Sequence, residues 1–88
     1  MNELTDKIIT FGRNYKSIVA TKIFEVSNDN DSYLLIYTKD DYTHKIYMEF
    51  EEIDKFFEKN KNKKEINMKD FLNKTYIIKD NKEILATK

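Results

Sequence analysis

The stretch SYLLIYTKDDYTHKIYMEF, from Ser32 to Phe50, decides the fold because it predicts two strands around a tight turn. It contains four of the six tyrosines and the only histidine of the chain. In the second strand, predicted over 42–50, alternate residues fall on opposite faces of a sheet. One face carries His44, Ile46, Met48 and Phe50, and the other carries Thr43, Lys45, Tyr47 and Glu49.

The segments upstream extend this hairpin into a meander. The first strand of the hairpin is predicted over 32–38, and the NDND run at 28–31 predicts a turn before it, because short polar side chains bond their own backbone. KSIVATKIFEV, at 16–26, is rich in β-branched and aromatic residues and predicts another strand. Three strands joined by short turns form an antiparallel meander.

The N-terminal segment predicts a short helix over 2–11. Asn2 can serve as its N-cap, and Leu4, Ile8 and Phe11 recur at the spacing of one helical face. A helix of this length is not stable alone, so it must dock on the sheet.

Two further helices are expected after the meander. The first, over 51–60, has acids in its first turn and bases in its last, which suits the helix dipole. The second begins at Asn67, which can cap it. Both repeat apolar residues at helical spacing: Ile53, Phe56 and Phe57 in the first, and Met68, Phe71 and Leu72 in the second.

The C-terminal segment, TYIIKDNKEILATK, has strand-like runs at 76–78 and 84–86 on either side of a DNK turn. It predicts either a hairpin or one added strand. The expected order is therefore α-β-β-β-α-α-β, in a single α+β domain over 1–88 with helices on one face of an antiparallel sheet.

Composition excludes several classes of function. Sixteen basic side chains balance sixteen acidic ones, so the chain has neither the basic excess of most nucleic-acid binders nor the acidic excess of a DNA mimic. The many Lys, Asn and Ile codons indicate a low-GC bacterium, its phage or a mobile element. Without cysteine, signal-peptide pattern or long apolar run, we expect a cytoplasmic protein with no membrane partner.

The sequence predicts no enzyme, no metal site and no cofactor. There is one histidine, one glycine and no nucleophile elbow, and we interpret His44 as a half-exposed histidine at a strand end. The NDND run resembles the start of a calcium loop, but Tyr33 and Lys39 occupy the positions where such a loop needs Gly and Glu.

The tyrosines predict a protein contact surface. If Leu34 and Ile36 join the buried face, then Tyr33, Leu35, Tyr37 and Tyr47 lie on the far side of the sheet. Tyrosine packs well and keeps a polar tip, which suits an interface. The predicted contact residues are Tyr33, Tyr37, Lys45 and Tyr47. Two alternatives remain: the C-terminal segment covers them, or they form the core face.

The run KNKNKK, at 59–64, provides a second candidate site. Lys59, Lys61, Lys63 and Lys64 can contact phosphates or another anionic partner. The alternative is a solvated helix exit, where cations favour the negative end of the dipole. Tyr42, Tyr47 and Lys45 could add a stacking surface of the kind that binds single strands.

The α-β-β-β-α layout resembles double-stranded-RNA-binding domains, but EFEEID stands where their second helix begins with a basic motif, so that function is excluded. The layout also resembles small phage anti-CRISPR proteins, which inhibit the type II Cas nuclease. The likeness lies in a short helix opening MN, a three-stranded meander, two following helices and a length just under ninety residues. This resemblance implies an inhibitor that binds a host or defence protein.

The first hypothesis is therefore a small non-enzymatic module of phage or mobile-element type that binds a larger protein stoichiometrically. The alternative is a nucleic-acid-binding accessory protein that uses the 59–64 lysines. A third interpretation is a homodimer formed through the same sheet or through an edge strand.

Overall fold

The structure is a computed structural model that describes residues 2–12, 14–40 and 42–87. These residues form a seven-stranded mixed sheet with one α-helix and one 3-10 helix. The strands are β1 (Glu3–Thr10), β2 (Ile18–Ser27), β3 (Ser32–Thr38), β4 (Thr43–Tyr47), β5 (Glu65–Asn67), β6 (Thr75–Lys79) and β7 (Lys82–Leu85). The helices are α1 (Phe50–Asn60) and the 3-10 helix η1 (Lys69–Lys74).

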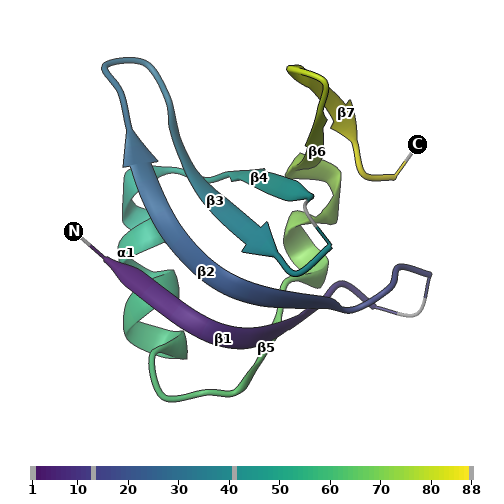
Figure 1. Ribbon diagram of the computed structural model, residues 1–88. Coiled ribbons are helices and arrows are strands. Elements are labelled where there is room, and N and C mark those ends of the chain that lie inside the picture. The colour runs from purple at the N-terminus through teal and green to yellow at the C-terminus, as the bar shows by residue number, and fades with distance from the viewer. Residues whose placement is uncertain (1, 13, 41, 88) are drawn as a thin grey trace.

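The strand order across the sheet is β5-β1-β2-β3-β4-β6-β7. Every neighbouring pair is antiparallel except β1 and β5, which run parallel. The sheet is strongly curved, and α1 lies against one of its faces (Figure 1). Within the described ranges, no helix is long and apolar enough to cross a membrane.

The predicted helix over 2–11 is wrong, because this segment is β1. Leu4 and Ile9 both pack in the core, although residues five apart in a regular strand point to opposite faces. An irregularity at Asp6, whose φ is 55°, turns the strand over between them. Ile8, which the predicted helical stripe placed beside Leu4 and Phe11, is not part of this core.

The neighbouring strand β2 has the same irregularity at the same level. Its register against β3 shifts between Ala20 and Lys22, which is a β-bulge. Ile18 and Ile23, again five residues apart, are consequently both buried. The bulge therefore lets both ends of the long strands β1 and β2 contribute to one core.

The predicted helix that begins at Asn67 is also wrong. Three residues, Glu65–Asn67, form β5 and pair in parallel with β1. The Asn67 side chain accepts a hydrogen bond from the Lys69 backbone N–H at 2.9 Å, which shapes a local turn. The segment then forms only the short 3-10 helix η1. The α-β-β-β-α-α-β order is thus replaced by a mostly-β arrangement.

The meander, the helix α1 and the C-terminal hairpin are present. Ile36 of β3 lies opposite Ile23 of β2 and His44 of β4, so the register matches the predicted alternation. A capping box of Glu49 and Glu52 starts α1. The two-residue turn between β6 and β7 has positive φ at both Asp80 and Asn81, as a type I′ hairpin turn requires.

The core lies between α1 and one face of the sheet. Leu34, Ile36 and Ile46 of the meander are completely buried there, as is Ile53 of α1. Phe56 and Phe57 of α1 are buried with them. Because Leu34 and Ile36 face this core, the tyrosines of β3 point to the opposite face of the sheet.

Candidate functional site: the tyrosine face

The face of the sheet opposite α1 carries the candidate site, which we call the tyrosine face. One row of cross-strand neighbours runs across it from β2 to β6, and shorter rows lie on each side. The tyrosine face consists of Phe24, Tyr33, Leu35, Tyr37, Lys45, Tyr47 and Tyr76. All four predicted contact residues, Tyr33, Tyr37, Lys45 and Tyr47, lie on it.

Aromatic rings on this face pack edge to face. The ring centroids are 5.2 Å apart for Phe24 and Tyr37, 5.9 Å for Tyr33 and Tyr47, and 5.6 Å for Tyr47 and Tyr76. Such pairs hold each ring in a fixed orientation and add about 0.5–1.5 kcal/mol beyond the area they bury. The face is therefore a pre-organised aromatic surface.

Lys45 lies at the centre of the aromatic cluster. Its Nζ is 4.1 Å from the ring centroid of Tyr33, 4.8 Å from that of Tyr47, and 3.5 Å from Oε1 of Glu83. The Tyr47 hydroxyl donates a hydrogen bond of 2.7 Å to the same carboxylate. Only 14% of the Lys45 side chain is exposed, so the ammonium group is held in place by these groups.

Lys45 and Tyr47 keep their usual ionisation states at neutral pH. Burial would lower the pKa of Lys45, but the Tyr47 hydroxyl and the Glu83 carboxylate outweigh burial and raise it. Burial, together with the hydrogen bond to Glu83, raises the pKa of Tyr47. Lys45 therefore remains a cation and Tyr47 a neutral phenol.

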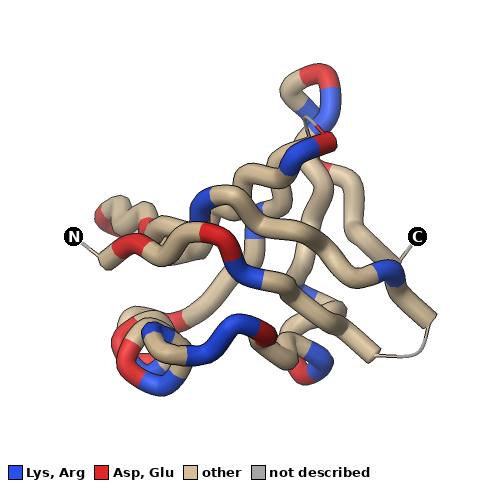
Figure 2. Tube along the Cα trace, turned by 60° about the horizontal axis from the view of Figure 1, so that its bottom comes forward, with Lys and Arg blue, Asp and Glu red and all other residues tan. Residues whose placement is uncertain are grey.

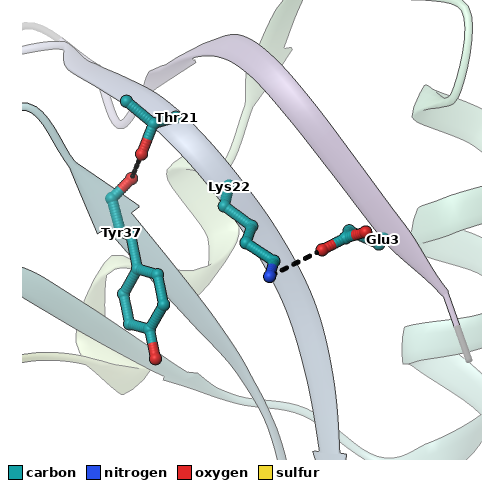
Figure 3. A network of polar contacts seen from close by, with 4 residues as sticks. All are labelled: Glu3, Thr21, Lys22 and Tyr37. Atoms are coloured by element: carbon teal, nitrogen blue, oxygen red, sulfur yellow. Dashed lines mark hydrogen bonds and ion pairs between the residues drawn. The ribbon is translucent and has the colours of Figure 1, made fainter.

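Two polar contacts of β2 lie at the other side of the tyrosine face, beside the bulge (Figure 3). The Thr21 hydroxyl donates a hydrogen bond of 3.0 Å to the carbonyl of Tyr37, and Lys22 forms an ion pair of 3.0 Å with Glu3. Tyr37 is the most open tyrosine of the face, with 41% exposed. Since Lys22 and Lys45 are each paired with a carboxylate, both lysines are neutralised locally.

The sequence did not predict every residue that forms or contacts the tyrosine face. Phe24 and Tyr76 were not predicted: both follow the alternation of their strands, but their place on this face depends on the order of the strands in the sheet. Glu83 gave no such signal, because its role depends on β7 folding back beside β6, which brings its side chain to Lys45 and Tyr47 of β4. The C-terminal segment, which one alternative expected to cover the tyrosines, contacts them at Tyr47: the Tyr76 ring packs on Tyr47, and Glu83 binds Lys45 and Tyr47.

Lys59 lies in the last turn of α1, and Lys61, Lys63 and Lys64 follow the helix. Figure 2 shows basic and acidic residues mixed along the helix. Lys61 forms an ion pair of 3.2 Å with Glu58, and Lys64 donates to the Asp6 carbonyl at 2.7 Å. Lys7 of β1 donates to the carbonyls of Lys61 and Lys63. Much of this segment therefore anchors the chain to β1, while Lys59 and Lys63 are exposed and have no ion pair within the described residues.

His44 is not the half-exposed residue that the sequence predicted. It is 6% exposed and faces the core, because it lies on the same side of β4 as Ile46. Its Nε2 is 3.5 Å from the Tyr15 hydroxyl, and its Nδ1 has no hydrogen-bond partner among the described residues. Burial lowers the pKa of His44, so the ring is neutral near pH 7. Within the same ranges, no group of three or more His, Cys, Asp or Glu residues is placed to hold a metal ion.

No protein-family model, curated protein or solved structure matches this chain. The resemblance to anti-CRISPR proteins depended on an N-terminal helix and on two helices after the meander. In the structure the first of these is the strand β1, and the last is the short 3-10 helix η1.

Proposed function

We propose that this protein is a non-enzymatic protein-binding module that acts stoichiometrically through the tyrosine face. The observation that carries the proposal is a sheet face with ordered aromatic rings on the side opposite α1. Tyrosines that are partly exposed and already fixed by their neighbours lose little entropy on binding. They are also frequent among the residues that dominate interface energies.

The charges of the face favour a protein partner over nucleic acid. A phosphate backbone needs lysines with free positive charge, but Lys22 and Lys45 are paired with Glu3 and Glu83. A tyrosine-centred surface with neutralised charges suits the buried centre of a protein interface, where charged residues are depleted. A stoichiometric binder of this kind can inhibit or regulate a larger host or defence protein without any catalytic group.

The test is capture of a partner from the lysate of a low-GC bacterium, with nuclease present, at low and at high salt. The captured protein is identified, purified and titrated by calorimetry. We expect one-to-one binding that survives nuclease and high salt, and that weakens at least about tenfold in Tyr37→Ala, as the loss of an interface tyrosine predicts.

Tyr42→Ala is the matched control. Tyr42 is 44% exposed, close to the 41% of Tyr37, but it lies in the loop between β3 and β4. We expect this variant to bind as the wild type does. Equal affinity of Tyr37→Ala and the wild type for the partner would overturn the proposal.

The same experiment decides the nucleic-acid alternative. In that case nucleic acid is recovered only at low salt, and Lys59→Glu combined with Lys63→Glu abolishes the recovery. These two lysines are chosen because the structure engages Lys61 and Lys64 in contacts within the chain. That outcome would replace the tyrosine face as the functional surface.

A further inference from the structure

A cleft of about 440 Å³ opens at one end of the tyrosine face. It lies where the loop between β2 and β3 meets the junction of β4 with α1 and the start of β6. Tyr47 and Tyr76 line the cleft and also belong to the tyrosine face, so the two surfaces are continuous. A partner that covers the tyrosine face therefore reaches the cleft as well.

Phe50 gives the cleft an exposed aromatic rim. The alternation of β4 predicted that Phe50 would join Ile46 and Met48 in the core, but the chain leaves the sheet after Tyr47 and Phe50 becomes the first residue of α1. As a result 55% of Phe50 is exposed, the largest value among the big hydrophobic residues of the described chain. Three aromatic residues, Tyr47, Phe50 and Tyr76, are thus among those that line the cleft.

The charge of the cleft is acidic, unlike that of the tyrosine face. Asp29, Asp31 and Glu49 line it, against the single cation Lys74. Glu49 also caps α1, since its side chain accepts a hydrogen bond from the Glu52 backbone, and so it meets the positive end of the helix. Asp29 and Asp31 have no ion pair within the described residues, which leaves two carboxylates to act on a ligand.

We infer that this cleft accepts an arginine side chain from the protein that binds the tyrosine face. An aromatic wall attracts a cation through its π-electrons, and carboxylates add charge-assisted hydrogen bonds. The planar guanidinium group uses both at once, because it stacks on rings and presents paired N–H groups to a carboxylate. This inference rests on the proposed function, and it adds the chemistry of the partner: a basic segment whose arginine reaches Asp29 and Asp31.

The first experiment requires no partner. The ¹⁵N-labelled protein is titrated with the peptide acetyl-Leu-Arg-Leu-amide and with the same peptide in which citrulline replaces arginine. Citrulline has nearly the shape of arginine but no charge. We expect the arginine peptide to shift backbone signals of Asp29, Asp31 and Tyr76, with an affinity at least about fivefold above that of the citrulline peptide, as a charge-assisted contact predicts. Equal shifts with both peptides, or arginine shifts confined to other parts of the protein, would overturn the inference.

The variant Asp29→Asn with Asp31→Asn removes both charges and keeps turn-forming residues in the loop. We expect it to bind the arginine peptide only as well as the citrulline peptide. Asp40→Asn is the matched control, since Asp40 is an exposed acid in a different turn, outside this cleft. An arginine preference that persists in the double variant contradicts the assignment to the cleft.

The captured partner separates this inference from the proposed function. Loss of partner binding in Tyr37→Ala but not in the double Asp variant leaves the tyrosine face established and overturns the arginine site. Wild-type binding by Tyr37→Ala overturns the tyrosine face, whatever the cleft does. If the tyrosine face and the arginine site are both correct, the double Asp variant binds the partner more weakly than the wild type at low salt. At high salt the two proteins bind with nearly equal affinity, because salt screens the attraction between the arginine and the two carboxylates.

Discussion

The two faces of the sheet are formed by the same strands but stabilise the protein in different ways. The core face presents aliphatic side chains such as Ile23, Leu34 and Ile36, which are completely buried against α1. The tyrosine face presents rings with polar tips, and its charges are paired across strands. The first face gains its stability by removing apolar area from water. The second is ordered by its own neighbours while part of it stays accessible, which is what a binding surface requires.

The adjacent leucines of β3 provide the largest test of this difference. Leu34 is completely buried, whereas Leu35 lies on the tyrosine face and is half-buried. We expect Leu34→Ala to lower the free energy of unfolding by about 2–5 kcal/mol, because it leaves a cavity in the core. Leu35→Ala should cost about 1 kcal/mol or less, since it buries less area and leaves no enclosed cavity.

Urea unfolding of both variants measures the comparison, with equal slopes of the transition as a check that the native states are comparable. The same residue type on the same strand removes differences in chain entropy and strand propensity. Equal losses in the two variants would contradict the assignment of the two faces.

His44 predicts a pH dependence that belongs to the core face. Burial lowers its pKa in the folded state, so the folded protein binds fewer protons than the unfolded chain once the pH falls below the unfolded value of about 6.5. The contribution of neutral His44 to the free energy of unfolding is therefore present above that pH. It is lost as the pH falls toward the pKa of His44 in the folded protein. The slope from a single group cannot exceed about 1.4 kcal/mol per pH unit.

His44→Phe keeps an aromatic ring at this position and removes the titration. Thermal unfolding of the wild type and the variant at pH 7.5 and pH 5.5 measures the effect. We expect the wild type to lose more stability than the variant over this range. If the difference in stability between the wild type and the variant does not change with pH, His44 is protonated to the same extent in the folded and the unfolded protein.

The smallest expected effect distinguishes Lys45 of the tyrosine face from Lys22, the cross-strand neighbour of Tyr37. Lys45 lies over two rings and is mostly covered. Lys22 lies farther from a single ring, 5.4 Å from the centroid of Phe24, and forms an ion pair whose two side chains are nearly half-exposed. We expect Lys45→Met to cost about 1 kcal/mol, from its cation–π contacts and its partner Glu83. Lys22→Met should cost about 0.5 kcal/mol or less, because water screens an exposed pair.

Urea unfolding at low and at high salt measures both variants. The cost of Lys45→Met should change little with salt, because the covered ammonium group is poorly screened. A cost for Lys22→Met as large as that for Lys45→Met would contradict the picture of Lys45 as the organising cation of the tyrosine face.

The meander and α1 were predictable because their signals are local. The alternation in 43–47 assigns Lys45 and Tyr47 to one face, and Ile53, Phe56 and Phe57 mark the buried stripe of α1. The tyrosine face followed from the same alternation once Leu34 and Ile36 were placed in the core. Its continuation over Phe24 and Tyr76 required the order of the strands in the sheet.

The sequence by itself determined which segments alternate, where the turns fall and which helix has an apolar stripe, since these depend on neighbours within a few residues. Only the tertiary structure decided that residues 3–10 form a strand, because a bulge in β2 and an irregularity at Asp6 set their side-chain directions together. It also decided that Glu65–Asn67 pairs with β1 and that Glu83 reaches Lys45. These contacts join residues far apart in the chain, so no local pattern records them.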